Sequence, residues 1–453
     1  MKKAYFPDIF RNSLVMGTFI LTVTGFVSRI IGFFNRIFIS HAFGEEAMGI
    51  FQLVAPVLAF TFSLCCAGIQ TAISKYVASE PHTHDYRTSM KYLRVSIIVS
   101  LSLSCLTGIF VYRFSDMIAT GFLFEPRTAP LLRILAVSFP FSAIHSCING
   151  YYYGIKNAKV PALLQLCEQI VRVGSVYFLY YLLLERNYQP DITLAAVGIA
   201  AGELCSLLLS LTFIFTRFYR FETTGTKIDS VMLGKNSYRN VFRHIMVMAV
   251  PLSANRIIVN LLQSVEAIYI PEKLRQFGMS TADSLSTYGV LTGMALSLIL
   301  FPCAITNSLG VLLLPVVSEA EAANQNGKIA AAIKKSITYC SLLGIVCTMF
   351  FLFFGKTAGI LLFKSELAGS FICGLSFICP FLYITSTLGS ILHGLGRAFT
   401  TFLINIGALF IRILSVFFLV PKVGISGYIA GLLLSQMFSA LVCTLCLNKY
   451  RQY

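Results

Sequence analysis

The 453-residue chain contains no tryptophan, and only 12% of its residues are charged. Soluble domains carry about a quarter of their residues as Asp, Glu, Lys and Arg, so this composition excludes an ordinary soluble protein. The chain also lacks a phosphate-binding loop of the Walker type, so ATP drive would need another chain. Without tryptophan, tyrosine must supply any aromatic belt at a membrane interface, and the run GYYYG at 150–154 suits that position.

Disulfide bonds are not expected either, although the chain has 13 cysteines. Most of them lie inside long apolar runs, where a thiol behaves as a small hydrophobic side chain. Cys443 and Cys446 have C-x-x-C spacing but fall within the last apolar run, which argues against a redox or metal role. His82, His84 and Asp85 lie together without a compelling further partner. We therefore expect no metal, no cofactor and no catalytic residue.

Long hydrophobic runs dominate the chain, and 57% of its residues are hydrophobic. The runs are continuous rather than alternating, which favours spanning helices over a membrane barrel. Each is long enough to cross ~30 Å of hydrocarbon as a helix. The first has a basic start but no cleavage site, so we expect an uncleaved span. The twelve predicted spans are 13–39, 48–75, 93–112, 128–155, 161–184, 192–216, 244–270, 286–317, 336–354, 367–393, 398–420 and 424–447.

The net charge is +16, and its distribution predicts how the chain lies in the membrane. Of the 35 Lys and Arg, 21 lie in the N-terminal segment and alternate loops, 9 lie in the opposite loops and 5 lie within spans. The positive-inside rule then places both termini and the basic loops in the cytoplasm. Membrane orientation is a simpler explanation of the basic excess than a nucleic-acid partner, so none is expected.

The sequence is duplicated. When residues 140–179 are laid over 380–419 without a gap, 12 of 40 positions are identical, including Arg172 and Arg412. The starts of the two halves also agree, since Arg29-Ile30-Ile31 matches Arg256-Ile257-Ile258. We predict two six-helix bundles, 1–216 and 244–453, joined by a cytoplasmic linker at 217–243. Six spans each give the bundles the same orientation, which is the parallel-repeat plan of some transporters, with a substrate site near the midplane.

Polar residues follow one face of several predicted spans, spaced three or four residues apart. On the first span this face holds Thr18, Thr22, Gly25, Arg29, Gly32 and Arg36, and on the seventh it holds Ser253, Arg256, Asn260 and Gln263, with Asn255 and Glu266 alongside. A charge at mid-span costs ~2.5–3.5 kcal/mol on insertion scales. Arg29 and Arg256 have no acidic residue one turn away. They predict a water-filled cavity or an anionic ligand, with bonding to backbone carbonyls as the alternative.

The other intramembrane charges have simpler interpretations. Arg172 lies one turn beyond Glu168, which favours a structural ion pair. Arg36 is near the end of its span, where its side chain could extend to the interface. Glu266 is the candidate for ion coupling. Arginines outnumber acids in the spans, so a cavity built from them favours phosphate or carboxylate, and the planar guanidinium matches phosphate oxygens in pairs.

Several stretches carry a family resemblance: SRIIGFFNRIFISHAFGEEAMGIFQLVAPV, GIQTAISKYVA, GYYYGIKNAKVPALLQLCEQIVRV, YGVLTGMALSLILFP and VPKVGISGYIAG. Through almost its whole length the chain resembles the stage V sporulation protein B group of the multidrug/oligosaccharidyl-lipid/polysaccharide (MOP) flippase superfamily. The resemblance implies an all-α membrane protein of two bundles in a V, alternating access, and a lipid-linked sugar pyrophosphate as cargo. It also implies the bacterial cytoplasmic membrane as location, and sporulation or peptidoglycan and polysaccharide synthesis as context.

Related MurJ-type lipid II flippases have the pattern S-R-x-x-G-F-x-R-D in the first helix, with arginines lining the cavity. Ser28, Arg29, Gly32 and Phe33 match this pattern, whereas Asn35 and Arg36 depart from it. By motif, only Arg29 carries over, and Arg256 rests on its place in the polar face.

The leading interpretation is therefore a flippase, not an enzyme. Its predicted substrate-binding residues are Arg29, Arg36, Asn255, Arg256, Asn260 and Gln263. The alternatives are a cation-coupled multidrug exporter and a non-transporting scaffold for envelope or spore peptidoglycan synthesis. Expected partners are the lipid bilayer and the lipid-linked sugar, with enzymes of cell-wall synthesis as further candidates.

Overall fold

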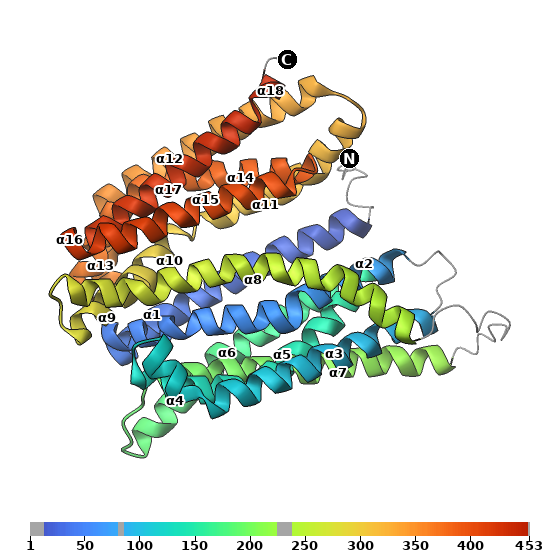
Figure 1. Ribbon diagram of the computed structural model, residues 1–453, viewed down its shortest axis with the longest axis horizontal. Coiled ribbons are helices and arrows are strands. Elements are labelled where there is room, and N and C mark those ends of the chain that lie inside the picture. Colours follow the sequence, from blue (N-terminus) through green and yellow to red (C-terminus); the bar gives the residue numbers. More distant parts are fainter. Residues whose placement is uncertain (1–12, 80–85, 224–237, 452–453) are drawn as a thin grey trace, which may run out of the picture. The chain divides into compact units, whose positions relative to one another are not determined.

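The computed structural model describes residues 13–79, 86–223 and 238–451, and every regular element in these ranges is helical. Figure 1 shows long helices linked by short turns. The all-helical class predicted from composition is confirmed. The long helices are α1 (Ser13–Phe62), α2 (Gly68–Ser79), α3 (Tyr86–Arg113), α5 (Ala129–Gly154), α6 (Lys159–Glu185), α7 (Thr193–Thr223), α8 (Tyr238–Gln276), α11 (Cys303–Ala322), α12 (Asn326–Phe363), α14 (Cys379–Gly394), α15 (Ala398–Phe418) and α17 (Ile425–Cys446).

Shorter elements connect or extend these helices. They are π-helices η2 (Ser63–Ala67), η3 (Ile118–Phe122) and η6 (Val290–Ala295), 3-10 turns η4 (Pro126–Thr128) and η7 (Ser376–Ile378), and helices α4 (Ser115–Met117), α9 (Thr281–Gly289), α10 (Leu296–Ile299), α13 (Glu366–Leu375), α16 (Val420–Val423) and α18 (Asn448–Arg451). The predicted linker at 217–243 is partly helical, because α7 continues to Thr223 and α8 begins at Tyr238. Residues 224–237 lie outside the described residues.

Eleven helices in the described ranges are long and apolar enough to cross a membrane. The first of them, Ile20–Ala78, holds two of the twelve predicted spans. These two spans are separated at Gly44, whose φ of 84° is a conformation that glycine adopts without strain. The predicted span 286–317 is interrupted. Pro302, which has no N–H to donate, lies between α10 and α11 and starts a new helix at Cys303. The multi-pass architecture is thus confirmed, with this one interruption.

The described chain forms two compact units. Unit 1 holds the residues up to Gly32 together with Val54–Leu261, and unit 2 holds Phe33–Leu53 together with the residues from Leu262 onward. Helices α1 and α8 therefore each contribute to both units. These units are not identical to the two continuous halves drawn from the sequence, and that division stays a prediction.

Each unit has its own hydrophobic core, and the two cores have equivalent positions. In unit 1, α2, α3, α5, α6 and α7 pack side by side (Figure 1) around a core that includes Val77, Ile148 and Tyr152. In unit 2 the core includes Val317, Leu388 and Leu392. Each residue of the second set lies 240 positions after its counterpart in the first. The duplication seen in the sequence is therefore present in the packing.

A matched glycine contact repeats this equivalence. A Cβ on Gly154 would lie 2.7 Å from Val77 Cβ and 2.9 Å from the carbonyl oxygen of Ser74. A Cβ on Gly394 would lie 3.3 Å from Val317 Cβ and 2.9 Å from the carbonyl oxygen of Leu314. Small residues at such points let two helix backbones approach closely inside a membrane.

Candidate functional site

The predicted substrate-binding arginines of unit 1 lie on α1 and α8. Arg29, Arg256 and the neighbouring Asn255 are all exposed. Within the described residues, neither arginine has a hydrogen bond or ion pair. On the same face of α1, a Cβ on Gly25 or Gly32 would meet no atom within 4 Å, so this face is not packed against protein. Both guanidiniums are thus left without a protein counter-charge on apolar helices.

The remaining predicted ligands fall in different places. Arg36 and Gln263 are exposed and belong to unit 2, so no single unit holds the whole predicted set. Asn260 differs from the others, because its amide nitrogen donates to the carbonyl oxygen of Ala59 at 3.0 Å and to Ser63 Oγ at 2.5 Å. These bonds join α8 to α1 and η2 within unit 1. The amide nitrogen of Asn260 is therefore engaged within unit 1, and the predicted role of this residue toward a substrate stays a prediction.

A second group of polar side chains lies inside unit 1, between α5, α6 and α7. Arg172 forms the ion pair with Glu168 that their spacing predicts, with Nη2 and Oε1 2.5 Å apart. The same nitrogen lies 3.9 Å from Oε1 of Glu203 on α7. One guanidinium is therefore shared by two carboxylates that are both mostly buried.

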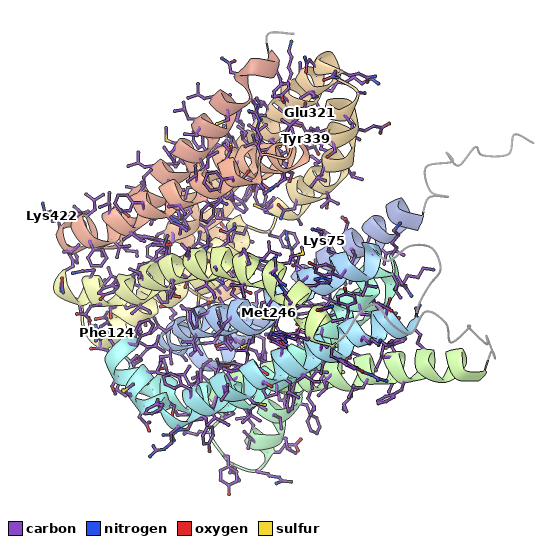
Figure 2. All side chains as sticks on the ribbon, turned by 45° about the vertical axis from the view of Figure 1, so that its right-hand side comes forward. Lys75, Phe124, Met246, Glu321, Tyr339 and Lys422 are labelled. Atoms are coloured by element: carbon purple, nitrogen blue, oxygen red, sulfur yellow. The ribbon has the colours of Figure 1, made fainter. Side chains whose placement is uncertain are left out.

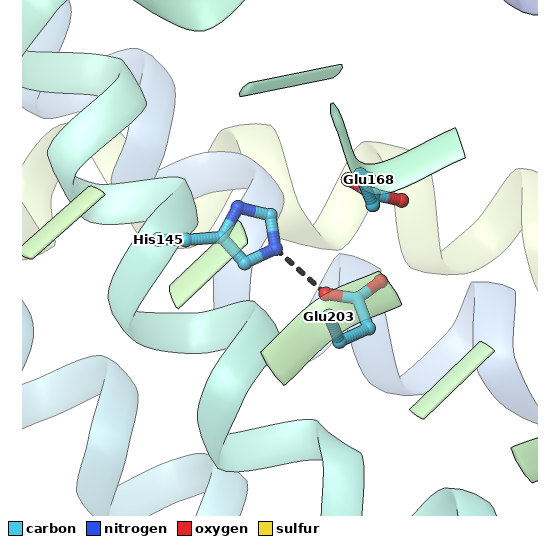
Figure 3. A group of neighbouring side chains, drawn as sticks. All are labelled: His145, Glu168 and Glu203. Carbon is cyan, nitrogen blue, oxygen red and sulfur yellow. Dashed lines mark hydrogen bonds and ion pairs between the residues drawn. The ribbon is translucent and has the colours of Figure 1, made fainter. Parts of the chain in front are cut away.

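Glu203 also contacts α5 through its second oxygen. His145 Nε2 lies 2.7 Å from Glu203 Oε2 (Figure 3), and Ser142 Oγ donates to the same oxygen at 2.7 Å. An ionised carboxylate only accepts hydrogen bonds, so His145 Nε2 carries the hydrogen and donates it. His145 is 7% exposed, and its other ring nitrogen, Nδ1, has no hydrogen-bond partner among the described residues.

Two glycines on α7 explain how these side chains come together. A Cβ on Gly198 would lie 2.9 Å from the carbonyl oxygen of Arg172, and one on Gly202 would lie 3.0 Å from the carbonyl oxygen of Glu168. The sequence GIAAG at 198–202 is therefore a small-xxx-small contact that lets α7 approach α6 closely. Glu203 follows directly and is brought to the Glu168–Arg172 pair.

The cluster borders a cavity of about 180 Å³ inside unit 1. Its polar lining includes Ser142, Arg172 and Glu203, and its apolar lining comes mainly from α1, η2 and α5. A cavity of this size with several polar partners is roomy enough for water. Ser142, Arg172 and Glu203 thus border a space that can hold water, inside a helical bundle of apolar composition.

A metal ion is a weaker candidate for this cluster. His145, Glu168 and Glu203 each offer one ligand atom, and these atoms lie within 4.8 Å of one another. However, the guanidinium of Arg172 already contacts Glu168 at 2.5 Å and lies 3.9 Å from Glu203, so a divalent cation would have to compete with it. The other possible metal residues, His82, His84 and Asp85, lie outside the described residues.

Unit 2 holds a simpler charged pair. Glu266, predicted as the ion-coupling candidate, is 6% exposed and lies 3.3 Å from Arg412 Nη1. Tyr428 on α17 donates its hydroxyl hydrogen to Glu266 at 2.6 Å. Arg412 is the duplicate of Arg172, and each unit pairs this arginine with a carboxylate. In unit 1 the nearest carboxylate, Glu168, is on the same helix as Arg172, whereas in unit 2 Arg412 of α15 pairs with Glu266 of α8. This contact gives Glu266 a counter-charge within the protein, and its role in coupling stays a prediction.

Sequence reasoning missed the connections of His145, Ser142, Glu203 and Tyr428. His145 and Glu203 are 58 positions apart, and Glu266 and Arg412 are farther apart still, so no local spacing links them. Two signals were present in the sequence. One is an ionisable residue within an apolar run, and the other is the small-xxx-small sequence directly before Glu203.

Comparison with solved structures defines the class of protein. The fold matches an inward-facing multidrug resistance MATE family transporter of the MOP superfamily with a TM-score of 0.69 at 15% identity, covering 94% of both chains. It matches the lipid II flippase MurJ in an inward closed conformation with a TM-score of 0.70 at 15% identity, covering 95% of this chain and 90% of that one. The chain is therefore a multi-pass membrane protein with the fold of MOP superfamily transporters.

The sequence then identifies the family. Residues 14–319 match the family model described as polysaccharide biosynthesis protein, and the chain belongs to this family. It is also 27% identical to stage V sporulation protein B of Bacillus subtilis (strain 168) over 443 residues, which covers 97% of this chain and 84% of the relative. The resemblance seen in the sequence motifs is confirmed, and the chain is a multi-pass membrane protein of the polysaccharide biosynthesis family with the fold of MOP superfamily transporters.

Proposed function

We propose that the protein is a flippase that moves a polyprenyl pyrophosphate carrying sugars from the cytoplasmic to the outer leaflet of the bacterial cytoplasmic membrane. Membership of the polysaccharide biosynthesis family supports a sugar-bearing cargo. A polyprenyl carrier is supported by the fold it shares with a lipid II flippase. Alternating access is the cycle that the MOP fold supports.

The observation that carries this proposal is the pair of exposed guanidiniums on apolar helices. Placing a charge at mid-span costs ~2.5–3.5 kcal/mol on insertion scales. Arg29 and Arg256 have no counter-charge among the described residues that would offset this cost. Arginine is well suited to a pyrophosphate, because its planar N–H groups match phosphate oxygens in pairs. We infer that these two side chains bind the pyrophosphate.

The other exposed polar residues have secondary roles in this proposal. Asn255 and Gln263 supply hydrogen-bond donors to phosphate or sugar, and Arg36 lies along the path toward the end of the first span. Asn260 is left out of this set, because its amide nitrogen is used within unit 1. The proposal includes no catalytic step.

Reconstitution into liposomes with candidate lipid-linked sugars, scored by outer-leaflet access, tests the proposal. Arg29→Ala and Arg256→Ala should each reduce the transport rate at least tenfold, because each removes charge-assisted bonds to phosphate. Arg186→Ala is the matched control, since Arg186 is an exposed arginine in the turn after α6. Full transport by the Arg29→Ala or the Arg256→Ala protein would refute the site.

The multidrug exporter remains the second candidate, favoured by the MATE-type fold. It predicts efflux of a fluorescent cationic dye from cells, and loss of that efflux in Glu266→Gln. A scaffold without transport predicts neither dye efflux nor lipid movement, while cell-wall synthesis still depends on the protein. The liposome and dye assays together separate the three.

A further inference from the structure

We propose that the His145–Glu203 pair of unit 1, with Glu168, Arg172 and Ser142 around it, is a proton-binding site that couples proton movement to transport. The coupling to transport rests on the proposed function, whereas the proton site itself rests on contacts inside unit 1. The proton is taken up at the buried Nδ1 of His145, whose hydrogen-bond partner Glu203 lines the adjoining cavity.

The geometry at His145 leaves one atom for this proton. Nε2 donates to Glu203 Oε2 at 2.7 Å, which fixes the neutral tautomer and leaves a lone pair on Nδ1. Nδ1 is buried and has no partner among the described residues. A buried polar atom without a partner is costly, and it requires an explanation in the chemistry of the site. Protonation at Nδ1 produces an imidazolium that the Glu203 carboxylate stabilises directly.

The charges of the cluster favour one added proton. With His145 neutral, the positive charge of Arg172 faces two carboxylates, Glu168 and Glu203, and one negative charge is in excess. Protonation of His145 makes the cluster neutral. The charged and titratable groups that face the cluster come from every element around it, namely His145 on α5, Glu168 and Arg172 on α6, Glu203 and Cys205 on α7, and Cys66 on η2.

The cavity connects this charge change to conformation. An excess charge is poorly tolerated in a dry interior, whereas a neutral, fully paired cluster is tolerated better. The deprotonated cluster therefore favours the hydrated cavity of about 180 Å³, and the protonated cluster favours a state from which water is excluded. A ligand shifts such an equilibrium when it binds the two states differently, and here the ligand is the proton. A sodium ion is less suited, because Arg172 already occupies both carboxylates.

Nuclear magnetic resonance of protein labelled with 15N-histidine, in lipid nanodiscs, tests the proton site without any cargo. The chain has six histidines, and His145→Gln assigns the signal of interest. We expect His145 to change from the neutral Nε2–H form to imidazolium as the pH of the sample is lowered. Glu203→Gln should weaken proton binding at His145 about tenfold or more, because it removes the charged acceptor. If that variant does not fold, Ser142→Ala takes its place. It removes a competing donor to Glu203 Oε2, so the hydrogen bond from His145 should become stronger and His145 should bind its proton more tightly.

The matched control is Glu125→Gln. Glu125 is a buried carboxylate of the same unit that pairs with Arg127 at 2.7 Å, and it is not part of the cluster. This variant should leave the His145 titration unchanged. A His145 signal that stays in one form from pH 5 to pH 8, or that follows sodium concentration at constant pH, would overturn the proton site.

A transport arm then tests the coupling. With one proton per lipid, a pH difference of about one unit should change the steady-state leaflet ratio of a transported lipid-linked sugar up to tenfold in wild-type liposomes. His145→Gln and Glu203→Gln should remove this dependence, whereas Glu125→Gln should retain it. Coupling is overturned if the His145 and Glu203 variants still follow the gradient. A titrating His145 in a protein that moves no lipid-linked sugar would instead contradict the proposed function and leave the proton site standing.

Discussion

The buried pair in unit 2 gives a prediction whose size follows from its surroundings. Glu266→Ala removes the carboxylate that lies 3.3 Å from Arg412 and accepts the hydroxyl of Tyr428. The Arg412 side chain is only 20% exposed, and its Nε has no partner among the described residues. The variant would therefore leave a mostly buried guanidinium without a counter-charge, and a buried hydroxyl without its acceptor.

Removing one partner of a buried ion pair costs about 3–5 kcal/mol in the free energy of unfolding. For a unit of roughly 200 residues this corresponds to a fall in Tm on the order of 10 °C. Tyr428→Phe removes only one hydrogen bond to a charged group and should cost about 1.5–3 kcal/mol. The double variant Glu266→Leu with Arg412→Leu removes both charges and fills the space, so its stability should be close to that of the wild type.

Thermal unfolding of the purified protein in a fixed detergent, followed by circular dichroism, measures this series. The predicted order of Tm is wild type and double leucine variant highest, then Tyr428→Phe, then Glu266→Ala. A Glu266→Ala protein whose Tm is within about 2 °C of wild type would refute the assignment of this contact as a stabilising buried pair.

Two further predictions concern the close helix contact in unit 1 and the orientation in the membrane. Gly202→Leu should lower Tm and broaden the His145 signal, because its Cβ would lie 3.0 Å from the Glu168 carbonyl oxygen, whereas Gly174→Leu on α6, where no atom lies within 4 Å, should be tolerated. Asn187→Cys should react with an impermeant maleimide in intact cells, whereas Lys156→Cys should react only after permeabilisation, since positive loops are predicted to be cytoplasmic. Labelling in the reverse pattern would contradict the predicted topology.

The spans could be predicted from the sequence because each depends on a continuous local property. An apolar run in lipid has to satisfy its own backbone hydrogen bonds, so it becomes a helix wherever it is long enough. The break at Pro302 was missed because apolar residues continue on both sides of the proline, and hydrophobicity alone does not reveal the missing N–H. The turn at Gly44 was seen only as a short gap between two runs.

The contacts of the candidate sites likewise divide into those that follow from local spacing in the sequence and those that depend on helix packing. The Glu168–Arg172 pair was predicted because its spacing of four places both residues on one face of α6. The contact of His145 with Glu203 was not, because it depends on how α5 and α7 pack. The glycines at 198 and 202 determine that packing, but a small-xxx-small sequence does not name its partner helix. The duplication predicted that Arg172 and Arg412 occupy equivalent positions. It could not predict that Arg172 pairs with Glu168 of its own helix, whereas Arg412 pairs with Glu266 of α8.

The central claim is that Arg29 and Arg256 bind a pyrophosphate headgroup. Native mass spectrometry of the purified protein measures this directly, by titrating a sugar-bearing polyprenyl pyrophosphate against the same carrier as a neutral alcohol. The account predicts that the wild type and Arg186→Ala prefer the pyrophosphate, and that Arg29→Ala and Arg256→Ala each lose at least tenfold of that preference. Equal preference in all four proteins, or no preference in the wild type, would contradict it.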